Sequence, residues 1–228
     1  TIYAAIGSGW ANDYPVIEGL LSAVHLDHSE NLHEPIEQIL REGELTSHSH
    51  CASIEESSAG RVVTIKTRVS RGNTTVIEFV DRFAMRGRVT TTELPVDPAP
   101  RGVHEGDVVD TPRSVLNRVT VTAPENMTAF AIVSGDFNPI HTSHRGADMS
   151  GMDAALVHGM WLCAAAQHAV PDLRITGWTY RMFGMVNLSD DVEITVERVG
   201  RISGGGLALE GTGRIDGETV ARARAPAA

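Results

Sequence analysis

One apolar segment, residues 155–170, limits most strongly how this chain can fold. The run is stopped by Pro171, and its apolar length predicts a buried helix. Ala164, Ala165 and Ala166 are small enough for a sheet to wrap closely around that helix. Val-, Ile- and Thr-rich segments separated by glycine-containing turns follow it and predict strands, at 175–183, 191–199, 207–215 and 218–224. This half of the chain therefore predicts one helix wrapped by an antiparallel sheet.

The first half repeats this order of elements without detectable sequence identity. Residues 15–28 carry apolar side chains at helical spacing and predict a helix, with His25 and His28 as surface or packing residues. Residues 31–44 predict a loop with a short helical turn. Three strands are predicted after it, at 47–54, 61–70 and 74–86. Residues 93–113 contain four prolines and little periodicity, which predicts a linker between the halves.

Composition and charge exclude several classes of protein. The formal net charge of -10 and the absence of a basic run argue against a nucleic-acid partner. No apolar run reaches the roughly 18 residues that a membrane span needs, and no signal segment is evident, so we expect a cytoplasmic protein with no membrane association. Cys51 and Cys163, one in each half, are expected to be free thiols.

The segment before the apolar helix carries residues suited to acid–base chemistry. In residues 130–141, FAIVSGDFNPIH, the carboxylate of Asp136 precedes the imidazole of His141 by five residues, and Gly135 and Pro139 bend the backbone. An acid and a base on one short rigid loop are what proton transfer requires. At neutral pH we expect Asp136 to be charged and His141 to lie near its switching point. The plainer alternative is an Asp-containing turn followed by a surface or core histidine.

The SGDFNPIH motif and the VHGM at residues 157–160 resemble the signature of MaoC-like (R)-specific hydratases and dehydratases. These are hot-dog folds that act on acyl thioesters. The segments VHGMWLCAAAQHA and GWTYRMFGMV further resemble the dehydratase region of type I fatty acid synthases, of the mycobacterial, corynebacterial and fungal beta-subunit types. The resemblance runs from about residue 109 to the end and is fainter before it.

The resemblance implies a fold class and a division of the chain. We expect an α+β double hot-dog fold, in which two helices are each wrapped by an antiparallel sheet. The first half has no SGDxNPxH counterpart, so it is expected to be non-catalytic and to shape the acyl pocket. The predicted division is a non-catalytic hot-dog half at 1–92, a linker at 93–113 and a catalytic MaoC-like half at 114–228.

The resemblance also implies roles for single residues. Asp136 and His141 would share the proton transfers at C2 and the 3-hydroxyl, and either could take the C2 proton. Gly159 would offer its backbone N–H to the thioester oxygen near a helix start, or would serve only close packing. Asn138 and Ser134 would position the loop. The substrate-pocket candidates are His158, Met160, Trp161 and Phe183. A histidine at a helix start is more often structural, and core packing would explain the other three as well.

The predicted function is dehydration of (R)-3-hydroxyacyl thioesters, carried on an acyl carrier protein, to trans-2-enoyl thioesters within a type I fatty acid synthase. No metal and no cofactor are expected, because the acid/base pair can hold and pass the proton itself. The substrate would be carried on phosphopantetheine or CoA. The expected partners are the carrier domain and other synthase domains, in a large homo-oligomer. The start at Thr1 and the ending ARAPAA suggest a piece of a longer polypeptide. The alternatives are a stand-alone (R)-specific enoyl-CoA hydratase and a non-catalytic hot-dog assembly module.

Overall fold

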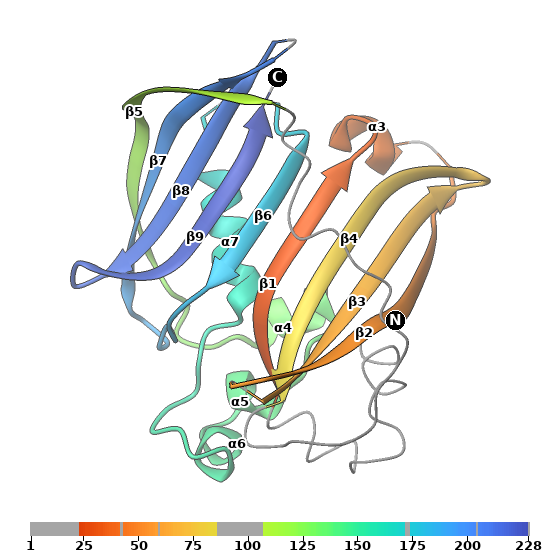
Figure 1. The fold of residues 1–228 in the computed structure, drawn as a ribbon. Helices are drawn as coiled ribbons and strands as arrows, with labels where there is room; N and C mark the ends of the chain where they lie inside the picture. The colour runs from red at the N-terminus through yellow and green to blue at the C-terminus, as the bar shows by residue number, and fades with distance from the viewer. Residues whose placement is uncertain are drawn as a thin grey trace.

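The computed structural model describes residues 23–41, 43–58, 60–85, 107–171, 174–203 and 205–227. Within them, nine strands form one antiparallel sheet in the order β2-β3-β4-β1-β6-β9-β8-β7-β5 (Figure 1). The strands of the first half are β1 (Ala23–Leu32), β2 (Thr46–Ser57), β3 (Gly60–Arg71) and β4 (Thr74–Met85). Those of the second half are β5 (Val108–Thr122), β6 (Gly177–Met182), β7 (Asp191–Ile202), β8 (Leu207–Ile215) and β9 (Glu218–Ala227).

The two halves join where β1 pairs with β6. The paired residues run from Asp27 opposite Arg181 to Asn31 opposite Gly177. In Figure 1 the strands of each half stay together on their own side of this seam. The sheet is continuous across the seam, so side chains from both halves can line a single cavity.

Strand β1 replaces the end of the helix predicted for residues 15–28. Residues 23–28 are extended and pair with β4 on one side, and β1 also pairs with β6 on the other; residues 15–22 lie outside the described residues. That prediction was wrong for residues 23–28, because pairing with two strands distant in sequence overrides a local helical pattern. The register of β1 against β4 shifts between His25 and Asp27, which marks a β-bulge or similar irregularity.

The other elements of the first half agree with the sequence prediction. The helical turn expected within 31–44 is α3 (Ile36–Arg41), whose Ile39 packs with Val76 and Ile77. The three predicted strands are confirmed as β2, β3 and β4. Strand β5 begins at Val108, inside the segment predicted as a linker, and residues 86–106 lie outside the described residues. The division into domains therefore stays a prediction.

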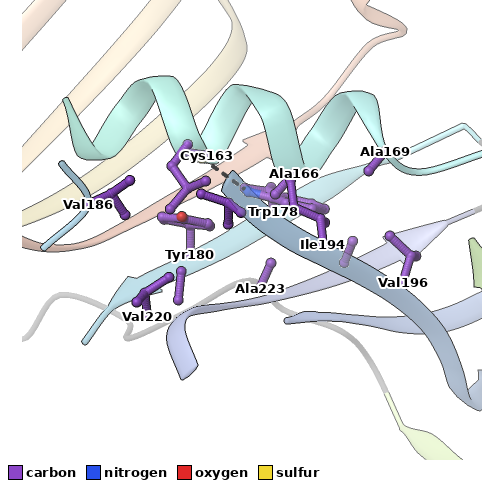
Figure 2. Close-up of a cluster of buried hydrophobic side chains, with 14 of the residues drawn as sticks. Cys163, Ala166, Ala169, Trp178, Tyr180, Val186, Ile194, Val196, Val220 and Ala223 are labelled. Carbon is purple, nitrogen blue, oxygen red and sulfur yellow. Dashed lines mark hydrogen bonds between the residues drawn. The ribbon is translucent and has the colours of Figure 1, made fainter. Parts of the chain in front are cut away.

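The second half contains the main hydrophobic core, which lies between α7 (Gly159–His168) and the sheet (Figure 2). Cys163 and Ala166 of α7 face Trp178 and Ile194 of the sheet, and the Trp178 Nε1–H donates to Cys163 Sγ at 3.2 Å. Ala166 is buried, as a close helix–sheet contact requires, whereas Ala164 is exposed.

The predicted helix at 155–170 is shorter than expected. Helix α7 begins at Gly159, because Leu156 forms an isolated bridge with Asn187 and so keeps the preceding residues extended. Three shorter helices precede it: α4 (Thr128–Ser134), α5 (Pro139–Thr142) and α6 (His144–Met149). Among the described helices, none is long and apolar enough to cross a membrane.

Candidate active site

The loop between α4 and α5 is held by its own polar side chains. Gly135 ends α4 in the left-handed conformation, at φ 74°. The backbone N–H of Asp136 donates to Ser134 Oγ at 3.2 Å, and that of Asn138 donates to Asp136 Oδ1 at 3.0 Å. The side chain of Asn138 in turn caps α5 by accepting from Ile140 N at 3.3 Å. These bonds fix the position of the Asp136 carboxylate.

His141 lies on α5 with a defined tautomer. Its Nδ1 is 3.0 Å from the backbone oxygen of Leu156. A carbonyl can only accept, so Nδ1 carries the hydrogen and Nε2 keeps a free lone pair. Burial, and next the adjacent His158 ring, lower the pKa of His141 to about 4. The expectation that His141 lies near its switching point at neutral pH is therefore wrong, and the ring is a neutral proton acceptor.

His158 contacts both Asp136 and His141. Its side chain is 2% exposed, and its ring stacks on that of His141 with centroids 3.9 Å apart. Its Nε2 lies 2.9 Å from the backbone oxygen of Asp136 and 3.7 Å from Asp136 Oδ2. Its buried Nδ1 has no hydrogen-bond partner among the described residues. The sequence left a pocket role and a structural role open for His158, because the stacking depends on how α5 approaches α7.

Asp136, His141 and His158 each place one polar atom within 4.8 Å of the others. Such a group could be considered for a metal ion. However, the His158 Nε2–H is used by the Asp136 carbonyl, and Asp136 Oδ1 accepts from Asn138 N. These two atoms are therefore engaged in bonds that hold the loop, and the remaining His158 Nδ1 is buried, whereas a zinc site needs three or four protein ligands directed at one point. The donor set is better suited to proton transfer than to metal binding, and the absence of a metal or cofactor stays a prediction.

A cavity of about 150 Å³ connects this group with the start of α7. Asp136, His141 and Gly159 all line it. Gly159 is the first residue of α7, and the N–H groups of Gly159 and Met160 have no hydrogen-bond partner among the described residues. The cavity thus combines a carboxylate, a neutral imidazole and a helix N-terminus with free donors.

Gly159 also has a packing reason to lack a side chain. A Cβ at this position would overlap the Sδ of Met182. The two interpretations of this glycine, donor and close packing, are therefore both compatible with the geometry.

The remaining predicted residues separate into two groups. Asn138, His158 and Met160 line the cavity, and Ser134 holds the loop from outside it. Trp161 and Phe183 were expected in the pocket but do not line it. Trp161 packs against the main core, and Phe183 is 54% exposed with the Arg181 guanidinium 5.5 Å from its ring centre.

The first half was expected to shape the pocket, but the sequence did not indicate which of its residues do so. Ala23, Val24 and His25 of β1 and Phe83 of β4 line the same cavity as the acid–base loop. Their place depends on the pairing of β1 with β6, and no local signal in residues 23–25 indicates it.

Comparison with known proteins shows which family and which relatives this chain is similar to. Residues 105–216 match the family described as the MaoC like domain. Over 137 residues the chain is 31% identical to the fatty acid synthase beta subunit TOXC of Cochliobolus carbonum, covering 57% of this chain and 6% of that protein. Over 113 residues it is 31% identical to 3-hydroxyacyl-thioester dehydratase X of Mycobacterium tuberculosis, covering 50% of this chain and 38% of that protein. The chain therefore spans less than half the length of these curated relatives.

Solved structures show the same fold over nearly the whole chain. The crystal structure of HtdX from Mycobacterium tuberculosis matches with a TM-score of 0.68 at 20% identity, covering 99% of this chain and 84% of that one. A MaoC-like dehydratase from Phytophthora capsici matches with a TM-score of 0.68 at 15% identity, covering 91% and 70%. With the nine-stranded antiparallel sheet, these matches confirm the expected α+β double hot-dog fold class.

Proposed function

Because residues 105–216 match the family described as the MaoC like domain, we propose that this chain is a hydro-lyase. It removes water from (R)-3-hydroxyacyl thioesters to give trans-2-enoyl thioesters, and by microscopic reversibility it also catalyses the reverse hydration. The observation that carries the proposal is the single cavity in which Asp136, the neutral His141 and the free N–H groups of α7 meet.

The reaction balances without an outside reagent. The C2–H and C3–O bonds break, the C2=C3 bond forms, and the proton from C2 leaves with the 3-hydroxyl as water. His141 Nε2 takes the C2 proton, because it is the ring nitrogen with a free lone pair. Asp136 Oδ2 orients the 3-hydroxyl, to which the imidazolium returns the proton. Both groups belong to one loop and reach one face of the substrate, so the elimination is syn.

Removal of the C2 proton places negative charge on the thioester oxygen. Preorganised donors must stabilise that charge in the transition state. The N–H groups of Gly159 and Met160 lie at the positive end of α7 and have no partner among the described residues. We assign the oxyanion role to Gly159, with Met160 beside it.

The likeness to fungal synthase subunits supports a larger setting for this chemistry. TOXC and the Saccharomyces cerevisiae fatty acid synthase subunit beta both contain a segment similar to this chain, which covers 6% and 5% of them. We therefore propose that the substrate is carried by an acyl carrier protein domain, in a cytoplasmic, homo-oligomeric fatty acid synthase. A free CoA ester as substrate is the second candidate, favoured by the likeness to dehydratase X.

Alanine substitutions of Asp136 and His141 test the activity. The assay follows hydration of crotonyl-CoA and crotonyl-pantetheine by the loss of their ultraviolet absorbance. Each variant should lose about 10²- to 10⁴-fold in kcat, the usual contribution of a general acid or base. His48→Ala, an exposed histidine on β2, is the matched control and should keep the wild-type rate. Unchanged turnover in folded Asp136→Ala would instead indicate a non-catalytic module.

A further inference from the structure

The first half places a buried polar cluster beside the catalytic cavity. Asp81 Oδ1 lies 3.0 Å from His25 Nε2 and 2.7 Å from His28 Nδ1. Residues three apart on a regular strand point to opposite faces, but the irregularity between His25 and Asp27 brings both rings to one carboxylate. His28 and Asp81 are buried, and His25 lines the cavity. We call His25, Asp81, His28 and Glu30 the polar partition.

A second cleft, of about 630 Å³, lies on the far side of this partition. Along β1, His25 lines the catalytic cavity, His28 lies in the partition, and Glu30 and Leu32 line the second cleft. Along β4 the same order holds for residues of one face: Phe83 lines the cavity, Asp81 the partition, and Phe79 the cleft. The partition therefore lies between the two spaces.

Residues of helix α7, which lies across the partition from β1 and β4, also pass from the catalytic cavity to the second cleft along the helix. Gly159, Met160 and Leu162 line the catalytic cavity, and Gln167 near the other end of α7 lines the second cleft. The Gln167 side chain donates to Glu30 Oε1 at 2.6 Å, and Glu30 Oε2 lies 3.7 Å from His28 Nε2. The partition thus connects the strands to the helix between the two spaces.

We propose that the polar partition ends the acyl pocket and restricts the enzyme to short acyl chains, with His25 as the specificity-determining residue. This inference rests on the proposed dehydratase function. A cavity of about 150 Å³ is the size that holds a benzene molecule, about six carbons. A longer chain, with C2 at His141, would have to continue between β1 and α7 and would meet His25.

The side chains of the polar partition are held in place by stacking, hydrogen bonds and an ion pair. The His25 ring is stacked on Phe83, with centroids 4.3 Å apart and planes 18° apart, and Asp81 holds its other edge. Behind it, His28 and Asp81 form a buried ion pair with a hydrogen bond of 2.7 Å. An aliphatic chain that separated them would leave a buried charge without its partner, which is strongly unfavourable. Long chains are therefore excluded.

Chain-length profiles test the inference. The 228-residue chain is assayed for hydration of trans-2-enoyl-CoA esters of four, eight and twelve carbons, as the wild type, His25→Ala, His25→Gln and His48→Ala. The wild type should prefer four carbons, and His25→Ala should raise the twelve-to-four ratio of kcat/KM by about 10-fold or more, as expected when space for added methylenes is opened. His25→Gln fills the same space and can still donate to Asp81, so it should restore the wild-type ratio, as should His48→Ala.

The outcomes separate the two proposals. Equal wild-type rates on four and twelve carbons, or an unchanged ratio in folded His25→Ala, overturn the inference and leave the dehydratase function standing. If the wild type hydrates none of the esters, nor crotonyl-pantetheine, both proposals fail together. Circular dichroism establishes folding, and because Asp81 keeps His28 as a partner in His25→Ala, that variant retains the buried ion pair.

Discussion

At the scale of single residues, the acid–base loop was predicted well from its sequence. SGDFNPIH contains the turn-forming and reactive side chains that hold Asp136, and each of those bonds is local. The protonation state of His141 could not be predicted in the same way. It depends on burial and on contacts with Leu156 and His158, which α7 and the segment before it bring to the loop.

The lowered pKa of His141 predicts an unusual pH profile. Because the pKa is about 4, and not 6.5 as for a free histidine, the ring remains a base through most of the acidic range. The acid limb of kcat/KM should therefore fall near pH 4, provided that circular dichroism shows a folded protein there. Initial rates on crotonyl-CoA from neutral to acidic pH measure this limb. An acid limb near pH 6.5 would contradict the neutral, buried His141.

The two interpretations of Gly159 can be separated with a pair of variants. Gly159→Ala should lower kcat by about 10²-fold, because a methyl group keeps the thioester oxygen from the backbone donors. The added Cβ also meets Met182 Sδ, the end of a flexible side chain. Gly159→Ala combined with Met182→Ala removes that contact, so urea unfolding should show recovered stability while kcat stays low. Recovery of kcat in the double variant would mean that the glycine serves packing alone.

At the scale of elements, strands with regular alternation and nearby partners were predicted correctly. β2, β3 and β4 form a meander with short turns, so their pattern and their pairing are both local. Residues 23–28 of β1 were assigned to a helix, because the neighbouring strands β4 and β6 are distant in sequence and the pattern of β1 is interrupted between His25 and Asp27. The start of α7 was also misplaced, since the bridge from Leu156 to Asn187 depends on a segment beyond the helix.

The ion pair that links β1 to β4 predicts how stability depends on pH. Burial alone would lower the pKa of His28, but the hydrogen bond to Asp81 and the nearby carboxylate of Glu30 outweigh it and raise that pKa to about 9. A histidine whose pKa rises on folding stabilises the native state fully below its unfolded pKa of about 6.5, and this contribution is lost as pH rises through about 9. A shift of this size corresponds to at most about 3 kcal/mol.

Urea unfolding at a series of pH values checks this expectation. The free energy of unfolding of the wild type should decrease between about pH 6.5 and 9, and this decrease should be absent from a variant carrying His28→Asn and Asp81→Asn together. His48→Ala should behave as the wild type. The same decrease in the double variant would show that other groups cause it.

At the scale of the whole molecule, the pairing of β1 with β6 gives the second half the wall that its own sequence lacks. The double hot-dog fold was predictable from family resemblance and element order. The contribution of His25 and Phe83 to the cavity was not, because it exists only when the two halves share one sheet. If the proposals hold, the second half supplies the acid–base groups and the first half ends the pocket, which would explain why the first half has no acid–base motif of its own.

The central claim is that His141 exchanges a proton with C2 of a bound thioester while Asp136 orients the 3-hydroxyl. Hydration of crotonyl-CoA in deuterium oxide, with the product examined by NMR, tests it most directly. The account predicts (R)-3-hydroxybutyryl-CoA with one deuterium at C2, added syn to the hydroxyl, and almost no product from Asp136→Ala or His141→Ala. Product formed at the wild-type rate by either variant, or deuterium added anti to the hydroxyl, would contradict it.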